Sequence, residues 1–547
     1  MEMKNLLTAA GAAILAIGAQ AGFTPDKSVM DKAYWALWND EVQAKIDADI
    51  EQYRKADASV AIDAPEGAEV KVEQTSHAFF FGAHIFNYNQ LGKTEWNERY
   101  KELYGTLFNS ATVAFYWRTL ERYPFAPRFA EAYEDTEEYW NREYEKDPIG
   151  PMYKPHWRRP APDPVVDFCL NRGVRIHGHP LVWGNNAWHT PTWLWEDFCP
   201  AKERLALEQA TGVKIPRRSW QVPIGVKDMK NDRNESAWPN AWRQIYEKLS
   251  EEEIAAIIPS YVKAQNFFYE KRIKDIAERY GTRIDSWDVV NESATDWSNG
   301  AKRTWPEGES SAVNKRPITK SWYGMMPANY AYNALVLARK YMKPDAWLNV
   351  NEYNMEAFPG QIADLKANGA DFDVVGSQMH LFDPKESQKI SEGVFSREVL
   401  DKTSPQGIAE TFARVSKASG GKPVHLSEIT ITAPDNSERG QMVQAIIMRN
   451  CYRAWFAVKD MTGITWWNVV DDCGAPGEPS ISGIFTRDMK PKTSYYAMDD
   501  LVNREWKTKT TVRAEGGKVA FRGFRGLYTL TWTDAAGKVC TKTVEVK

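Results

Sequence analysis

Two glutamates stand directly after short apolar runs that are typical of buried strands. Glu292 closes "SWDVVNE", with no turn residue between the valines and Asn291, and Glu428 closes "PVHLSE". A fold that brings two carboxyl groups together can use one to donate a proton and the other to attack carbon or activate water. Hydrolysis of a glycosidic bond is a reaction that depends on such a pair.

The separation of the two carboxyl groups would decide the stereochemistry of that reaction. A gap of roughly 5–5.5 Å lets one carboxylate act as the nucleophile and retains the anomeric configuration, whereas about 6.5–9.5 Å leaves room for water and inverts it. The sequence does not give this distance. It does indicate which elements carry the two residues.

Eight short apolar runs alternate with longer helical stretches from residue 78 onward, and this order is typical of parallel βα units. The expected strands are 78–85, 110–115, 173–179, 283–292, 346–352, 372–380, 423–428 and 463–470. Eight such strands are the number that closes a (β/α)8 barrel, so an α/β fold of this type is predicted. In the segment 251–281, the amphipathic pattern predicts a helix that ends at Gly281.

Polar and aromatic residues recur where these strands end. They are His177, His179 and Trp183; Asn291 and Glu292; Asn351, Glu352 and Asn354; Gln378 and His380; Glu428; and Trp466 and Trp467. Active sites of such barrels lie at the carboxyl ends of the strands. A single one of these residues could be a satisfied core residue, but their coincidence on six strands predicts a site.

The motifs "WDVVNE", "GSQMHL", "LSE" and "WWNVVDD" resemble glycoside hydrolase family 10, the retaining endo-β-1,4-xylanases built on (β/α)8 barrels. The stretches "VVDFCLNRGVRIHGHPLVW", "LNVNEYN" and "GIFTRDMKPKTSYYAMDDL" extend the resemblance over most of residues 78–502. It implies that Glu292 is the general acid/base and that Glu428 is the nucleophile of a double displacement. It implies no cofactor and no metal.

The same resemblance assigns substrate contacts. Asn291 would bind the 2-hydroxyl of the sugar being cleaved, and His380 would keep the nucleophile ionised. The residues expected to shape the same sugar subsite are His179, Trp183, Gln378 and Trp467, with Asn354 counted among the substrate-binding positions.

The chain departs from the family pattern at positions that contact substrate. Ala114 and Phe115 stand for a Glu-Asn pair, Arg118 for Lys, Gly184 for His, Asn186 for Gln and Ala475 for Trp. These changes predict a β-linked glycan whose sugar beyond the cleaved unit differs from plain xylose or carries a branch. A local misalignment around an insertion is the alternative, and the aromatic loops could also rebuild the missing contacts.

Segments outside the barrel have their own signatures. Residues 1–21 read as a signal peptide, which predicts a secreted, periplasmic or cell-surface protein. Residues 22–77 are expected to form helices and a β hairpin with its turn at Pro65-Glu66-Gly67, and residues 505–547 a small antiparallel β module. Residues 123–162 and 195–245 are expected to be long loops inserted above the barrel of residues 78–504.

Composition narrows the class of protein further. A net charge of −4 and a pI near 6.2 give no sign of a nucleic-acid partner, and after the first segment no apolar run is long enough to span a membrane. The 23 tryptophans suit either a sugar-binding surface or an aromatic core. The five cysteines form no CxxC motif, leaving at most a single disulfide of unknown pairing. A monomer acting on a polysaccharide or oligosaccharide is expected.

Two other classes of function compete with catalysis by the glutamates. One is a carbohydrate-binding protein without activity, but such a protein has no need of Asn291 beside an acid. The other is a metal-dependent hydrolase, because alternation along a strand puts His177 and His179 on one face. No further ligand cluster with suitable spacing is evident in the sequence.

Overall fold

Eight strands form one closed parallel barrel in the computed structural model, which describes residues 22–148, 159–185, 189–216, 237–299, 317–475 and 478–547. The strands are β3 (Phe80–His84), β4 (Ser110–Ala114), β5 (Arg175–His179), β7 (Ser286–Asn291), β10 (Trp347–Glu352), β11 (Val374–Leu381), β12 (Val424–Ile431) and β13 (Met461–Trp466). Each pairs in parallel with the next, and β13 pairs with β3 to close the ring. The predicted (β/α)8 barrel is therefore confirmed.

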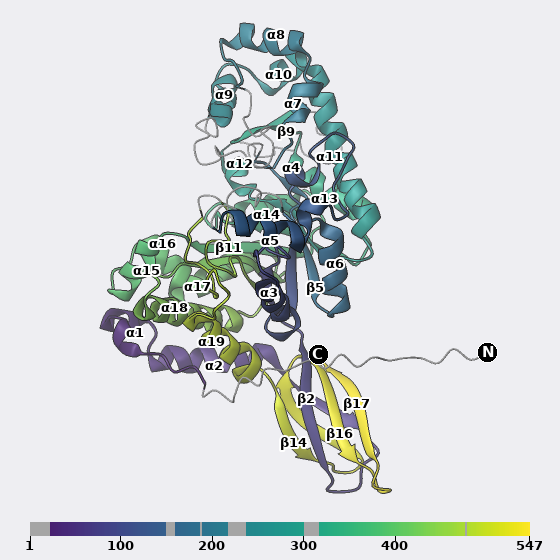
Figure 1. The fold of residues 1–547 in the computed structure, drawn as a ribbon, viewed down its shortest axis with the longest axis vertical. Coiled ribbons are helices and arrows are strands. Elements are labelled where there is room, and N and C mark those ends of the chain that lie inside the picture. Colours follow the sequence, from purple (N-terminus) through teal and green to yellow (C-terminus); the bar gives the residue numbers. More distant parts are fainter. Residues whose placement is uncertain (1–21, 149–158, 186–188, 217–236, 300–316, 476–477) are drawn as a thin grey trace, which may run out of the picture.

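One long helix follows each strand and covers the barrel (Figure 1). In chain order these are α3 (Thr94–Thr106), α6 (Pro162–Asn171), α11 (Pro259–Tyr280), α13 (Tyr330–Tyr341), α14 (Phe358–Ala367), α17 (Pro405–Ser419), α18 (Glu438–Ala457) and α19 (Thr493–Asp500). The helix predicted over 251–281 is divided into α10 (Glu251–Ile257) and α11. Pro259 is the cause, because it lacks an N–H for the preceding turn and suits the first position of a new helix.

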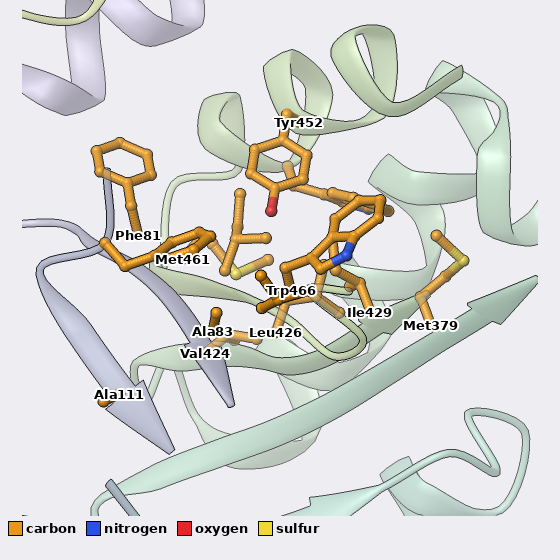
Figure 2. Packing of buried hydrophobic residues seen from close by; sticks show 14 of the residues in the cluster. Phe81, Ala83, Ala111, Met379, Val424, Leu426, Ile429, Tyr452, Met461 and Trp466 are labelled. Carbon is orange, nitrogen blue, oxygen red and sulfur yellow. The ribbon is translucent and has the colours of Figure 1, made fainter. Parts of the chain in front are cut away.

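The apolar layer between barrel and helices fixes which way the tryptophans of the eighth strand point. Figure 2 shows Trp466 of β13 beside Tyr452 of α18, among side chains of β3 and β12. The two ring centroids are 6.4 Å apart, and Trp466 is fully buried. Since neighbouring residues of an extended chain face opposite sides, Trp467 is directed away from this layer.

The inserted segments form a helical layer with its own core, at the end of the molecule opposite the β module (Figure 1). The elements that contribute to this core are α4 (Trp117–Leu120), α7 (Trp193–Phe198), α8 (Ala201–Thr211), α9 (Ala237–Tyr246), α10, the first part of α11, β8 (Ile318–Ser321) and β9 (Gly324–Pro327). The short elements η2 (Tyr133–Asp135), α5 (Glu137–Lys146), β6 (Val182–Trp183) and α12 (Ala294–Ser298) also interrupt the alternation of barrel strands and helices but contribute no residue to this core. The expectation of long loops is therefore wrong for these parts. Their aromatic residues fold inward, and both Trp238 and Trp242 of α9 are fully buried.

The termini share one β module, which differs from the sequence-based expectation. Residues 32–54 form the helices α1 (Lys32–Leu37) and α2 (Asp40–Arg54), followed by β1 (Lys55–Ala61) and β2 (Glu69–His77). The predicted hairpin is wrong, because β1 pairs with β15, while β2 lies between β14 and β16. The C-terminal strands are β14 (Lys509–Arg513), β15 (Lys518–Phe524), β16 (Gly526–Thr533) and β17 (Val539–Val546).

The sequence pattern could not reveal this exchange, because alternation gives the buried face of a strand but not its partner. Val70 and Val72 of β2 pack into the same small core as Tyr528 and Leu530 of β16. The module is thus built from both ends of the chain, and β2 leads directly into the first barrel strand.

Two further helices, α15 (Pro384–Ser391) and α16 (Arg397–Thr403), precede α17. Across the described residues, the structure contains no helix with the length and apolar character needed to cross a bilayer. The expected signal peptide, residues 1–21, lies outside the described residues.

Candidate active site

Both glutamates lie at the carboxyl side of the barrel strands. Glu292 follows Asn291, the last residue of β7, and Glu428 is in the second half of β12. Glu428 and Asn291 are almost completely buried. The barrel thus brings together two carboxyl groups that the sequence separates by more than a hundred residues.

The side-chain amide of Gln378 links the two carboxyl groups. Its Nε2 lies 3.2 Å from Glu292 Oε1 and 3.0 Å from Glu428 Oε1. Because both oxygens contact the same nitrogen, they can be separated by no more than the sum of the two distances, about 6.2 Å. The same nitrogen also lies 3.2 Å from Asn291 Oδ1.

Asn351, at the end of β10, supplies a second amide between the two strands. Its Nδ2 donates to Glu428 Oε1 at 2.8 Å and to Asn291 Oδ1 at 2.9 Å. The hydroxyl of Ser427 donates to Asn351 Oδ1 and so fixes the orientation of this amide. The register of the barrel makes these contacts possible, because Asn351 pairs with Asn291 and Gln378 with Glu428.

A buried carboxylate orients His179 towards Glu428. Asp288 Oδ2 lies 2.7 Å from His179 Nδ1 and 2.9 Å from His177 Nε2. The remaining nitrogen of His179, Nε2, is 3.8 Å from Glu428 Oε1. Burial alone would raise the pKa of Asp288, but the two histidines hold it below its usual range. Asp288 therefore remains ionised and fixes the His179 ring.

His380 approaches the other oxygen of Glu428, with Nε2 at 3.6 Å from Oε2. Its Nδ1 lies 3.0 Å from the hydroxyl of Thr430, and its ring stacks on Phe382. Burial lowers the pKa of His380 to about 4, so the ring is neutral near neutral pH. The expectation is that His380 keeps Glu428 ionised. A neutral ring cannot do so through a positive charge and could act only through an N–H group.

Burial is the largest cause of the pKa shifts of both glutamates. The pKa of Glu292 is raised to about 7 by burial and, second, by the negative charge of Glu428, while hydrogen bonds from Gln378 and Trp183 oppose the shift. Burial raises the pKa of Glu428 to about 8, against the lowering effect of His179 and Asn351. Glu428 is buried and Glu292 is half-buried, and two such carboxyl groups in contact with one amide cannot easily both be charged, so near neutral pH the pair retains a proton.

The remaining predicted contacts fall into two groups. Trp183 Nε1 donates to Glu292 Oε2 at 3.0 Å, and the ring of Trp467 lies 5.4 Å from that of His179. Asn354 instead donates a hydrogen bond from Nδ2 to Thr295 Oγ1 and accepts one at Oδ1 from the Ala357 N–H. These contacts hold the loop after β10, and a role for Asn354 in sugar binding stays a prediction.

The divergent positions have structural causes. Phe115 is not in the site, because its ring packs against Tyr280 and Trp287 in the core. Ala114 lies among Phe86, Trp467 and Tyr116 and completes a small apolar wall.

Gly184 has no room for a side chain. A Cβ there would lie 2.5 Å from the hydroxyl of Tyr330 and 2.9 Å from Asp296 Oδ2. The histidine of the family pattern is therefore excluded by packing at this position. Three other divergent positions lie elsewhere. Ala475, in the loop after β13, donates its N–H to Glu478 Oε2, and the N–H of Arg118 donates to the His189 carbonyl. Asn186 is outside the described residues.

Sequence reasoning missed several groups that complete the site. Asp288 gave a signal, since it is a charged residue in an otherwise buried apolar strand. Tyr116 also gave a signal, since it directly follows the expected strand 110–115, and its ring lies 5.5 Å from that of His179. Arg159 gave none; its guanidinium lies 4.5 Å from the Phe86 ring centre. These residues come from segments that only the fold brings to the barrel mouth.

Within the described residues, one group of side chains has donors suited to a metal ion. His179, Asp288 and Glu428 each offer an atom within 4.8 Å of the others. The histidine pair noted in the sequence thus does meet acidic partners. His179 Nδ1 and Asp288 Oδ2 already form a hydrogen bond, so a metal ion would have to compete with that contact.

A closed parallel barrel with two neighbouring carboxyl groups, bridged by the side-chain amide of Gln378 at the carboxyl ends of its strands, is the arrangement of a glycoside hydrolase. The comparisons with known proteins agree. Residues 257–501, which include Glu292 and Glu428, match the model of glycosyl hydrolase family 10. This part of the chain, which holds both glutamates, is therefore similar to that family.

Its similarity to individual relatives is low. It is 22% identical over 357 residues to endo-1,4-beta-xylanase B of Thermotoga neapolitana, covering 63% of this chain and 74% of that protein. It is 25% identical over 192 residues to a putative endo-1,4-beta-xylanase of Caldicellulosiruptor saccharolyticus, covering 35% of this chain but only 40% of the relative. Among solved structures, xylanase B from Clostridium stercorarium F9 has 16% identity and a TM-score of 0.44, covering 77% of this chain and 96% of that one.

Proposed function

We propose that this protein hydrolyses internal β-1,4 linkages of xylan or a related plant-type β-glycan with retention of anomeric configuration. The observation that carries the mechanism is the contact of Gln378 Nε2 with both carboxyl groups, which limits the separation of Glu292 Oε1 and Glu428 Oε1 to about 6.2 Å. Inverting enzymes need about 6.5–9.5 Å to admit water between the carboxyl groups. The names of the relatives support the choice of xylan as substrate.

In the first step, a carboxylate oxygen of Glu428 attacks the anomeric carbon, while Glu292 gives its proton to the departing glycosidic oxygen. The bond to that oxygen breaks, and a glycosyl ester forms on Glu428. In the second step, Glu292 takes a proton from water, the water oxygen attacks the same carbon, and the ester bond breaks. Both glutamates return to their starting protonation states.

The groups around the two glutamates suit an acid/base role for Glu292 and a nucleophilic role for Glu428. Trp183 and Gln378 orient the carboxyl group of Glu292 by one hydrogen bond to each oxygen. Asn351 and Gln378 both donate to Glu428 Oε1, which leaves Oε2 for bond formation. The Oδ1 atom of Asn291 accepts hydrogen bonds from Asn351 and Gln378, which fixes the amide so that its nitrogen is the atom that can donate to a sugar hydroxyl.

A branched or non-xylan β-glycan is the second candidate substrate. The observation that favours it is the exclusion of any side chain at Gly184, together with the apolar wall of Phe86, Ala114 and Trp467. Arg159, stacked on Phe86, adds a cationic group beside this wall. A site rebuilt in this way would contact a different sugar beyond the cleaved unit.

Product analysis of the purified protein on linear xylan, branched xylans and other β-glycans separates the candidates. Xylo-oligosaccharides from linear xylan support the first, and cleavage restricted to branched or other glycans supports the second. If no substrate is cleaved while oligosaccharide binding persists, the protein is a binding protein without activity. Loss of activity in a chelator, restored by metal, would instead favour a metal-dependent reaction at His179, Asp288 and Glu428.

We also propose that the protein works outside the cytoplasm, as a monomer. Support for export comes from the sequence of residues 1–21, with an apolar run followed by Ala19-Gln20-Ala21. Mass determination of the mature N-terminus from the producing cell tests it; an intact Met1 in the extracellular fraction or retention in the cytoplasm would contradict it.

A further inference from the structure

Glu352, the last residue of β10, holds two active-site loops with one carboxyl group. Its Oε2 accepts the N–H of Ala294 at 2.6 Å, and its Oε1 accepts the N–H groups of Tyr353 and Asn354, both at 2.9 Å. Ala294 is the first residue of α12 and follows Glu292 by two positions, whereas Tyr353 and Asn354 follow β10. Glu352 is completely buried and has no part in the mechanism above.

The backbone that Glu352 holds is in an unusual conformation. Glu292 has φ +53°, in the left-handed region that side-chain-bearing residues rarely adopt. Such conformations persist only when surrounding contacts impose them. Two such contacts come from β10: the N–H of Glu292 donates to the Asn351 carbonyl at 2.8 Å, and the N–H of Ala294, two residues on, donates to Glu352.

We propose that Glu352 is a positioning residue for the acid/base: by holding the Ala294 N–H, it maintains the left-handed turn that directs the carboxyl group of Glu292 towards Trp183, Gln378 and Glu428. This inference rests on the proposed function, since it takes Glu292 as the proton donor. Asn351 positions Glu428 directly through its side chain, and the next residue along the same strand, Glu352, positions Glu292 through the backbone.

The chemistry of the contacts explains why a carboxyl group is needed. Three N–H groups face two oxygens, so both oxygens must act as acceptors; a carboxyl group has acceptor lone pairs on both oxygens, whereas an amide has them on one. Burial raises the pKa of Glu352 to about 8, and the three backbone N–H groups oppose that shift. In Glu352→Gln, an amide NH2 would face at least one N–H, and one contact would be lost.

The test compares two substrates that differ in their need for the acid. For a xylo-oligosaccharide, whose leaving group is poor, Glu352→Gln should lower kcat/KM by about 10–100-fold, since displacements of about 1 Å cost rates of that order. For an aryl xyloside with a strongly acidic phenol, which leaves without protonation, kcat/KM should change by less than about threefold. Glu356→Gln, an exposed residue of the same loop, is the matched control and should change neither.

A purely structural role would lower both values together, along with the melting temperature, and that result overturns the proposal. Glu352→Asp keeps the acidic group on a shorter side chain, so this variant should show the same selective loss even if Glu352→Gln fails to fold. An equal loss on both substrates in the Asp variant also overturns the proposal. Glu292→Ala is measured alongside. If Glu292→Ala itself shows no leaving-group selectivity, the proposed acid/base role has failed; if it does and the Glu352 variants do not, only the positioning role has failed.

Discussion

The side chain of Asn351 donates a hydrogen bond to Glu428 at 2.8 Å, from a strand that is not adjacent to the one carrying Glu428. The contact crosses the barrel mouth over the intervening strand β11, which supplies Gln378. Glu428 is therefore held from two strands at once. Its position depends on the curvature of the barrel as much as on local sequence.

Replacing the proposed nucleophile should abolish turnover without disturbing the fold. Glu428→Ala removes the carboxylate that attacks the anomeric carbon, so hydrolysis of natural substrates should become undetectable while the melting temperature stays near that of the native protein. Activity assays and thermal unfolding measure the two effects. Glu438→Ala, an exposed position at the start of α18, should leave both unchanged. Near-native activity in Glu428→Ala would exclude the nucleophile assignment.

The anomeric outcome should be retention. Proton NMR of the first products released from a β-linked xylo-oligosaccharide should show the β anomer before mutarotation, because two displacements at one carbon restore its configuration. Initial release of the α anomer would mean direct attack by water. The limit of about 6.2 Å between the carboxyl oxygens would then have to widen when substrate binds.

The pKa of Glu292 should depend on the charge of Glu428. Burial and the Glu428 charge raise the pKa of Glu292 to about 7. In the active form the two carboxyl groups hold one proton between them, and they lose it as pH rises through about 7 to 8, so kcat/KM should decline on the alkaline side of that range. In Glu428→Gln the neighbouring charge is gone, and the pKa of Glu292 should fall. Carbon NMR titration of the side-chain carboxyl groups checks this, and an unchanged or raised pKa would contradict the coupling.

A side chain at Gly184 should destabilise the fold. In Gly184→Ala the new methyl group would overlap the Tyr330 hydroxyl and Asp296, and overpacking of this kind costs about 1–3 kcal/mol. Unfolding in denaturant should show the loss. Adding Tyr330→Phe removes the closest atom, although it also removes the hydroxyl that bonds Asp296, so we expect partial recovery. If Gly184→Ala is neutral, packing does not explain the missing histidine.

A buried ion pair should stabilise the loop after β13. Lys492 Nζ lies 3.1 Å from both oxygens of Asp471, and neither side chain is appreciably exposed. Lys492→Met leaves a buried charge without its partner and should cost about 3–5 kcal/mol at pH 8. Lys492→Met combined with Asp471→Asn should regain much of this loss.

The pH dependence of that loss has a definite sign. Burial raises the pKa of Asp471 to about 6 even with Lys492 in place, and without the lysine it should rise further. At pH 5.5 Asp471 is then largely protonated in the Lys492→Met variant, so the deficit should be smaller than at pH 8. Denaturant unfolding at the two pH values measures it; an equal deficit would show that the lysine acts through packing alone.

The sequence by itself determined the barrel and the two glutamates. Each barrel strand is a short apolar run that ends in polar residues, and this pattern depends only on which residues are buried, so the eight strands could be read directly. The family motifs around Glu292 and Glu428 are contiguous and survive in a divergent chain. Local signals of these kinds need no knowledge of partners.

Only the tertiary structure decided how distant segments meet. Alternation in residues 58–74 predicted two strands correctly but paired them with each other, whereas β2 lies between two C-terminal strands. The aromatic insertions looked like loops because their helices bury tryptophans in a core of their own. Likewise the sequence places Glu352 at a strand end and Asp288 inside an apolar strand, but it does not show which groups they bind. Their roles come from the N–H groups and the histidine rings that the barrel register places within hydrogen-bond distance, because contacts between strands depend on register and closure, which no single segment encodes.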